Sequence, residues 1–283
     1  MDKNKKNVAF FDLDGTLCDS SGEVLPSSVK AIRQFREQGN IAFICTGRSK
    51  PEILDSIVDI GFDGVVGAGG GYIVVGDKII HHKRLPKDAV QDIVKYFDEN
   101  DVGYYLECND GLFKSENCER KIREELKQHA AEIGETPENL NHKMTWFYEL
   151  LEKYDGLEVD YNNVNKISFI NNTVPFDDIV NRYGESLQIY HSTVPLFGKW
   201  SGEIGIKGIS KKEAIEFVLN YLGVDKEQSI AFGDGNNDIA MFEVVGYGIA
   251  MANATPDLKK IANEITADSD SDGIAISLEK WLV

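Results

Sequence analysis

Two aspartates separated by one residue, Asp12 and Asp14, directly follow the apolar run Val8–Phe11. Aspartate is depleted in strands and neighbouring carboxylates repel each other, so the pair is a costly way to end a buried strand. Carboxylates act as nucleophiles, as general acids and bases, and as ligands for hard divalent cations. The pair therefore marks a candidate catalytic site, and the plain alternative is an Asp-Gly turn at Asp14 and Gly15.

Two more apolar runs end in polar residues. Ile41–Cys45 is followed by Thr-Gly-Arg at 46–48, and Ser229–Phe232 is followed by Gly-Asp-Gly-Asn-Asn-Asp at 233–238. In parallel α/β sheets ligands bind at the carboxyl ends of strands, so these segments should meet at one edge. Clustered carboxylates need a neutralising cation, and Mg²⁺ suits carboxylates combined with phosphate. The donors at 46–47, and Lys211 in the first turn of a capped helix, suit the phosphate itself.

The elements that position these residues alternate between strand and helix patterns, which predicts a parallel sheet covered by helices. Ser49 and Glu52 have capping-box spacing, and Ser210 and Glu213 repeat it. A serine is expected to cap the helix that Gly39 ends. The expected strands are 8–11, 41–45, 64–66, 229–232 and 248–251, and the expected helices are 27–40, 49–61, 209–223 and 236–245.

The pattern changes after an expected hairpin of Tyr72–Val75 and Lys78–His82. From 85 to 203 helix and strand patterns mix, which indicates an α+β domain inserted into the α/β domain. We therefore expect a doubly wound, mostly parallel, Rossmann-like core at 1–84 and 204–283, with an inserted α+β cap domain at 85–203. Within the insertion we expect helices at 88–97 and 116–133 and strands at 104–107 and 166–170, while 135–165 has no clear pattern.

Composition limits the classes of partner. A formal charge of −17 disfavours a basic face for nucleic acid or anionic membranes. No apolar run approaches the roughly 20 residues that span a bilayer, and the basic start "MDKNKKN" lacks the apolar core of a signal peptide. The four cysteines form no Cys-x-x-Cys pair, so reduced thiols and a cytoplasmic location are expected.

Four short segments, "FFDLDGTL", "CTGR", "GISKKEAI" and "GDGNNDIAM", occur in this order. They resemble the four motifs of the haloacid dehalogenase superfamily, in its phosphatase branch. The insertion between the second and third motifs, with "IAMANATPDLKKIA" and "DGIA" near the end, resembles the Cof-like sugar-phosphatase family and its type-two, subtype B cap. The resemblance implies a Mg²⁺-dependent phosphoric monoester hydrolase that acts on small phosphorylated metabolites, with sugar phosphates as the first guess.

The resemblance also implies a role for each motif residue. Asp12 would be the nucleophile that forms an aspartyl phosphate, and Asp14 would protonate the leaving oxygen and then activate water. The metal would be held by Asp12, the backbone carbonyl of Asp14 and Asp234, with Asp238 in the outer shell. The phosphate-binding residues would be Leu13, Thr46, Gly47, Lys211 and Asn237.

Several alternatives stay open at this point. The family often has Lys-Gly after the third-motif serine, whereas Lys211 is followed here by Lys212, so Lys207 and Lys212 remain alternatives for the phosphate contact. A phosphomutase would use the same core chemistry, and a non-catalytic phosphometabolite-binding regulator could keep the fold. Retention of both Asp12 and Asp14 favours the enzyme. Nucleotide and cofactor phosphates are the next substrate guesses, and the sequence does not reveal the oligomeric state.

Overall fold

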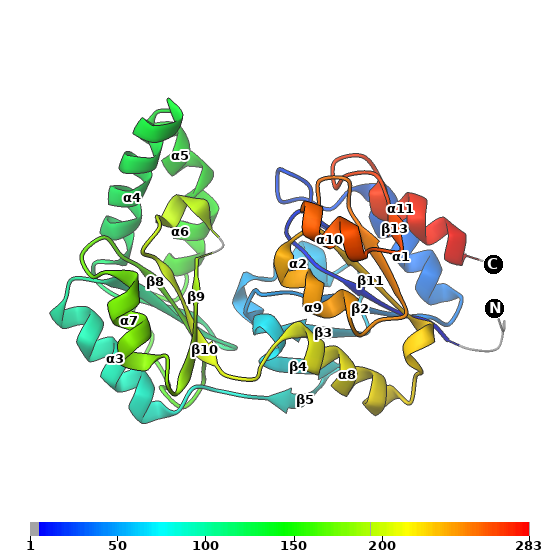
Figure 1. Ribbon diagram of the computed structural model, residues 1–283, viewed down its shortest axis with the longest axis horizontal. Coiled ribbons are helices and arrows are strands. Elements are labelled where there is room, and N and C mark those ends of the chain that lie inside the picture. The colour runs from blue at the N-terminus through cyan, green and yellow to red at the C-terminus, as the bar shows by residue number, and fades with distance from the viewer. Residues whose placement is uncertain (1–5, 193, 283) are drawn as a thin grey trace. The chain divides into compact units, whose positions relative to one another are not determined.

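The computed structural model describes residues 6–192 and 194–282, and these residues divide into two compact units. The first unit contains 6–48, 53–82 and 208–282, and the second contains 49–52 and the described part of 83–207. The second unit is thus inserted into the first. The chain leaves the first unit after His82 and rejoins it at Gly208 (Figure 1).

The first unit is built on one sheet that is mostly parallel. Its strands lie in the order β13 (Glu264–Ile265), β12 (Tyr247–Ala250), β11 (Ser229–Gly233), β1 (Val8–Phe11), β2 (Ile41–Cys45), β3 (Gly64–Gly67), β4 (Tyr72–Val75) and β5 (Lys78–His82). Neighbours from β13 to β3 are parallel, and β4 and β5 continue the sheet as an antiparallel hairpin. The mixed α/β fold expected from the sequence is confirmed.

Helices cover both faces of this sheet, because successive strand residues point to opposite sides. In β1, Ala9 and Phe11 pack on one layer while Val8 and Phe10 pack on the other, and all four are buried. Burying each large apolar side chain contributes roughly 1.5–3 kcal/mol. One layer contains α1 (Pro26–Glu37), α2 (Asp55–Val58) and α11 (Gly273–Leu278), and the other contains α8 (Lys211–Leu222), α9 (Ile239–Phe242) and α10 (Pro256–Ile261).

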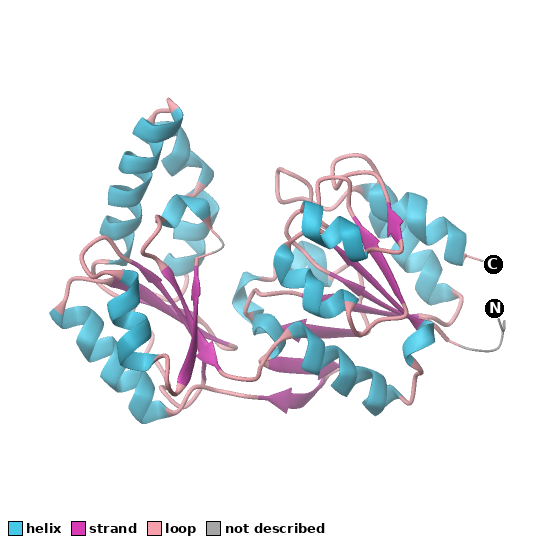
Figure 2. Ribbon diagram, in the orientation of Figure 1, coloured by secondary structure: helices cyan, strands magenta, loops and turns pink. Residues whose placement is uncertain are grey.

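The second unit has its own antiparallel sheet, with helices on both faces (Figure 2). The strands lie in the order β7 (Leu112–Lys114), β6 (Gly103–Cys108), β8 (Val164–Ile170), β10 (Gly202–Ile206) and β9 (Leu187–His191). One face packs on α3 (Lys87–Glu99) and α7 (Phe176–Tyr183), and the other on α4 (Cys118–Ile133), α5 (Pro137–Lys143) and α6 (Thr145–Glu152). None of the helices described in either unit is long and apolar enough to cross a membrane.

The structure departs from the expected helix at 49–61. A short 3₁₀ turn at Lys50–Glu52 is separated from α2, which begins only at Asp55. The amide of Ser49 donates to the Glu52 carboxylate at 2.8 Å, as in a capping box. The Ser49 hydroxyl, however, donates to the Glu107 carboxylate of the second unit at 2.8 Å and caps nothing. A contact distant in sequence therefore replaces the local cap on which the prediction depended.

The other two predicted helix starts differ in outcome. In α1 the expected serine cap is wrong, because Leu25 occupies the N-cap position and Pro26 follows it, where the fixed φ of proline suits a first helical turn. In α8 the hydroxyl of Ser210 accepts from the amide of Lys212 at 3.1 Å. Gly223 ends α8 with a φ of +65°, so both predicted ends of this helix are confirmed.

All four cysteines lie among the described residues and are buried free thiols. Cys18 and Cys45 belong to the first unit, and Cys108 and Cys118 belong to the second. Burial raises the pKa of all four thiols, that of Cys45 to about 12.

Candidate active site

Three neighbouring strands end at one edge of the first unit's sheet. β1 lies between β11 and β2, and all three run parallel, with Phe11 opposite both Phe232 and Ile44. The amide of Asp12 continues this pairing by donating to the carbonyl of Phe232 at 3.1 Å. The segments that follow the three strands therefore emerge side by side, as a topological switch point requires.

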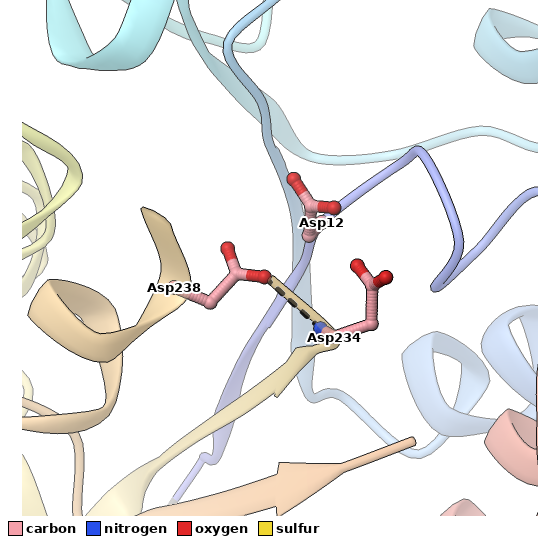
Figure 3. A group of neighbouring side chains, drawn as sticks. All are labelled: Asp12, Asp234 and Asp238. Carbon is pink, nitrogen blue, oxygen red and sulfur yellow. Dashed lines mark hydrogen bonds between the residues drawn. The ribbon is translucent and has the colours of Figure 1, made fainter. Parts of the chain in front are cut away.

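A cluster of three carboxylates occupies this edge (Figure 3). Asp12, Asp234 and Asp238 each offer one oxygen within 4.8 Å of the other two. Asp12 and Asp238 are buried, and Asp234 is half-buried. Oδ2 of Asp238 accepts hydrogen bonds from the amides of Asp234 and Gly235, each at 3.0 Å. Asp238 thus holds the loop that presents Asp234. In doing so, Asp238 commits its Oδ2 to two backbone amides.

Lys211 places an ammonium group between two of these carboxylates. It is the first residue of α8, and its Nζ donates to Oδ1 of Asp12 at 2.5 Å and to Oδ1 of Asp238 at 2.6 Å. Only 4% of its side chain is exposed. Lys212 instead pairs with an exposed glutamate, and Lys207 donates to a backbone carbonyl of the second unit. Of the three lysines that the sequence leaves open, the structure brings Lys211 to the cluster.

The cluster carries more negative charge than one lysine neutralises. Burial, and then the charge of Asp238, raises the pKa of Asp12 to about 8, against the opposing effect of Lys211. The same two causes raise the pKa of Asp234 to about 6. Although burial disfavours its charge, the carboxylates of Asp12 and Asp238 raise the pKa of Lys211. Crowded carboxylate oxygens whose negative charge is not fully neutralised suit a hard divalent cation such as Mg²⁺.

The other residues expected to bind phosphate differ in exposure. Thr46 is buried at the end of β2, where its hydroxyl accepts from the amide of Arg48 at 3.1 Å, and Gly47 is half-buried. Asn237 is exposed on the loop between β11 and α9. The Leu13 side chain is fully buried in the core, so only its backbone can face a ligand.

Sequence reasoning missed residues that organise the Asp234 carboxylate. The hydroxyl of Thr16 donates to Oδ1 of Asp234 at 3.2 Å, and Nδ2 of Asn253 lies 3.4 Å from its Oδ2. Asn253 also donates to the carbonyl of Gly15 at 2.8 Å. Gly15 has a φ of +73°, and a Cβ there would lie 2.5 Å from Oδ2 of Asp234, so both conformation and space require glycine. Gly15, Thr16 and Asn253 all lie within the motif segments quoted above, and this position in the sequence is the signal that could have identified them.

The Asp14 side chain does not join the cluster. It is 66% exposed and forms an ion pair with Arg48, which sequence reasoning left without a role. The expectation that the Asp14 carboxylate belongs to the cluster is therefore wrong, because the described cluster contains Asp12, Asp234 and Asp238. The metal contact that the resemblance implies for Asp14 is its backbone carbonyl, which does not involve the side chain.

Comparison with known proteins adds to this geometry. The family model for haloacid dehalogenase-like hydrolases matches residues 9–278. YkrA of Bacillus subtilis is 28% identical over 278 residues, which cover 96% of each chain. The 5-amino-6-(5-phospho-D-ribitylamino)uracil phosphatase YwtE of the same organism is 26% identical over 283 residues and is also similar over 96% of both chains. Among solved structures, a sugar phosphatase of haloacid dehalogenase subclass IIB has the same fold, with a TM-score of 0.72 at 21% identity over 98% of this chain and 99% of the other.

Proposed function

Because this chain belongs to the haloacid dehalogenase-like hydrolases, in their Cof-like branch, and is a phosphatase, we propose that it hydrolyses small phosphorylated metabolites with the help of Mg²⁺. We take sugar phosphates as the first substrate class and an aspartyl phosphate as the intermediate. The observation that carries the proposal is the position of Asp12, buried at the end of β1 with Lys211 in contact and two further carboxylates nearby.

In the proposed first step, the Asp12 carboxylate attacks phosphorus while Asp14 gives a proton to the leaving oxygen. In the second step, Asp14 takes a proton from water, which attacks the aspartyl phosphate and releases inorganic phosphate. The transferring oxygens carry negative charge throughout, so donors fixed in place before the reaction lower the barrier. We assign that task to Lys211, Thr46, Gly47, Asn237 and the backbone of Leu13.

The proposed metal site uses the carboxylates of Asp12 and Asp234 with the backbone carbonyl of Asp14. Asp238, whose oxygens are bonded to Lys211 and to two amides, acts on the site from outside by holding the Asp234 loop. When bound, Mg²⁺ supplies positive charge that favours ionised carboxylates and offsets the charge of the phosphoryl oxygens.

We also propose that the inserted segment 85–203, which lies within the second unit, is a cap domain that selects the substrate. Every residue assigned above to chemistry belongs to the first unit, which leaves substrate selection as a role for the second. Phosphate release from a broad panel of phosphorylated metabolites with Mg²⁺ tests the substrate class.

Substitution of exposed aromatic residues of the second unit, such as Trp146 and Tyr190, should reorder the preferred metabolites. Hydrolysis of para-nitrophenyl phosphate should stay within a modest factor, and an unchanged order would contradict the cap role.

A cytoplasmic location, without nucleic-acid or membrane partners, completes the proposal. Four free thiols suit a reducing compartment, and a formal charge of −17 repels phosphate backbones and anionic lipids. Fractionation of cells that express a tagged chain checks the location, and recovery in an exported fraction would contradict it.

Asp14→Asn tests the proton-transfer role. General acid–base assistance is typically worth about 10²–10⁴ in rate, and an alkoxide leaving group needs that proton. An alkyl phosphate should therefore lose much of this factor, whereas para-nitrophenolate departs unprotonated. With the aryl ester we expect a burst of nitrophenol and then a slow steady rate, because breakdown of the aspartyl phosphate still needs a base. Rapid-quench kinetics and intact mass measure both parts. Equal losses for both esters, with no phosphoryl-enzyme, would contradict the assignment.

A further inference from the structure

Arg48 forms a bidentate ion pair with the carboxyl group of Asp14, and both residues belong to the first unit. Its Nε donates to Oδ2 at 3.0 Å and its Nη2 donates to Oδ1 at 2.5 Å. Paired bonds from a planar guanidinium fix the plane of a carboxylate as well as its distance, which the point charge of a lysine does not. The Asp14 side chain is 66% exposed, so without this contact little would hold it in one orientation.

Arg48 is itself anchored at its backbone. Its amide donates to the Thr46 hydroxyl at 3.1 Å, and its carbonyl accepts from the amide of Ala68 at 2.8 Å. Only 15% of its side chain is exposed, so the stem is covered although the ion pair lies at the surface. Most surface ion pairs contribute little because both partners are mobile, and a bidentate pair on a fixed base is the exception. The parallel pairing of β1 and β2 brings the two loops together.

We propose that Arg48 is a positioning residue that holds the Asp14 carboxyl group in the orientation its proton transfers require. This inference rests on the proposed function and adds a residue that acts through Asp14. As the Asp12–phosphorus bond forms and the ester P–O bond breaks, one Asp14 oxygen gives its proton to the departing alcohol. As water attacks and the Asp12–phosphorus bond breaks, the same carboxylate takes the water proton. The guanidinium can keep one oxygen in place while the other carries the proton.

The rival role for an arginine here is direct binding of the substrate phosphate, since guanidinium groups suit phosphate as well as carboxylate. The two roles differ in which substrates suffer when the arginine is removed. A phosphate ligand contributes to every ester alike. A residue that orients the acid contributes most where the leaving group most needs a proton.

The test uses Arg48→Ala and Arg48→Lys on a series of aryl phosphates from para-nitrophenyl to phenyl phosphate, with glycerol phosphate as the alkyl ester. Misplacing a catalytic group by about 1 Å can cost about 10²-fold, so we expect losses of about 10–10²-fold for phenyl and glycerol phosphates. The burst with para-nitrophenyl phosphate should change by less than about threefold, because that leaving group needs little protonation. Arg48→Lys should recover only part of the loss, since it keeps the charge without the fork.

A double variant, Asp14→Asn with Arg48→Ala, separates the two roles because residues that act as one unit are non-additive. We expect it to be no slower than Asp14→Asn alone. Arg36→Ala is the matched control: Arg36 forms a bidentate pair with Asp63 in the same unit, at 2.9 and 2.7 Å, away from the cluster. It should leave the dependence on leaving group unchanged. Arg48→Gln replaces the alanine variant if that variant fails to fold in a thermal unfolding check.

Equal losses for all esters, a raised KM and additivity with Asp14→Asn would overturn the proposal and assign Arg48 to phosphate binding. If Asp14→Asn itself shows no dependence on leaving group, the proton role of Asp14 fails, and the inference fails with it. If Asp14→Asn behaves as expected while Arg48→Ala is additive, only the role of Arg48 fails.

Discussion

Asp12→Asn is expected to leave almost no turnover with any phosphorylated substrate. The amide of asparagine cannot form the acyl-phosphate bond, so no leaving group, however acidic, rescues the first step. Loss of a covalent nucleophile costs on the order of 10⁶-fold in other enzymes, and we expect at least about 10⁴-fold here. Phosphate release and intact-mass detection of the phosphoryl-enzyme measure the effect.

The fold should survive this substitution. Asp12 is one of three crowded carboxyl groups whose ionisation burial opposes, and a neutral amide removes that cost while Lys211 keeps Asp238 as a partner. We therefore expect the melting temperature of Asp12→Asn to equal or exceed that of the parent in metal-free buffer. Asp59→Asn, at an exposed acidic position of the same unit, is the control and should keep full activity. Retention of more than a few per cent of turnover by Asp12→Asn would exclude it as the nucleophile.

Removal of divalent cations should abolish activity as completely as Asp12→Asn does. The cluster of Asp12, Asp234 and Asp238 offers crowded oxygens with Lys211 as the neighbouring ammonium, and a phosphoryl group would add further negative charge. Excess EDTA should stop phosphate release and Mg²⁺ should restore it. Ca²⁺ should restore it poorly, because its looser and longer coordination misplaces the reacting groups. Full turnover in excess EDTA would rule the metal site out.

Stability gives a second measurement of the same site, independent of turnover. Burial raises the pKa of Asp12 to about 8 and that of Asp234 to about 6, from 3.8. Between about pH 4 and pH 8 these two groups therefore hold more protons in the folded, metal-free protein than in the unfolded chain, so their contribution to the free energy of unfolding falls as pH rises. The raised pKa of Lys211 adds stability that is constant below its unfolded value of 10.5, so it does not alter this window.

Mg²⁺ competes with protons for these carboxylates, so the stabilisation that it adds should grow as pH rises through the window. Thermal unfolding in EDTA and in Mg²⁺, at several pH values, measures the difference between the two melting temperatures. A Mg²⁺ effect that shrinks as pH rises would contradict the assignment of these aspartates as its ligands.

The parallel core was predictable because its strands are buried on both faces and read as continuous apolar runs, such as Val8–Phe11 and Ile41–Cys45. The second unit was less so. Strand β9 (Leu187–His191) mixes buried, half-buried and exposed positions, and β10 (Gly202–Ile206) mixes buried and half-buried ones. No continuous apolar run marks either strand. The break at 53–54 also escaped prediction, because the partner of Ser49 is Glu107, 58 residues away.

The candidate site shows the same division. Motif order and strand ends predicted which residues meet, since adjacent parallel strands bring their following loops together. Side-chain pairing was not predictable. Lys211 and Lys212 are adjacent and identical in type, and only the direction in which each leaves α8 decides which one reaches Asp12. Nor does the sequence show that Asp14 meets Arg48, because several nearby acids could have taken that arginine.

Each unit contains two buried cysteines, so the rate at which these thiols react measures how often that unit opens. With its pKa near 12, Cys45 carries almost no thiolate at neutral pH, and its burial keeps a maleimide from reaching it. Cys18 and Cys45 can then react only when the first unit opens, and Cys108 and Cys118 only when the second does. Labelling followed by peptide mass mapping would thus time the two openings in one sample. Equal rates would identify one cooperative unfolding unit, and unequal rates two foldons of different stability.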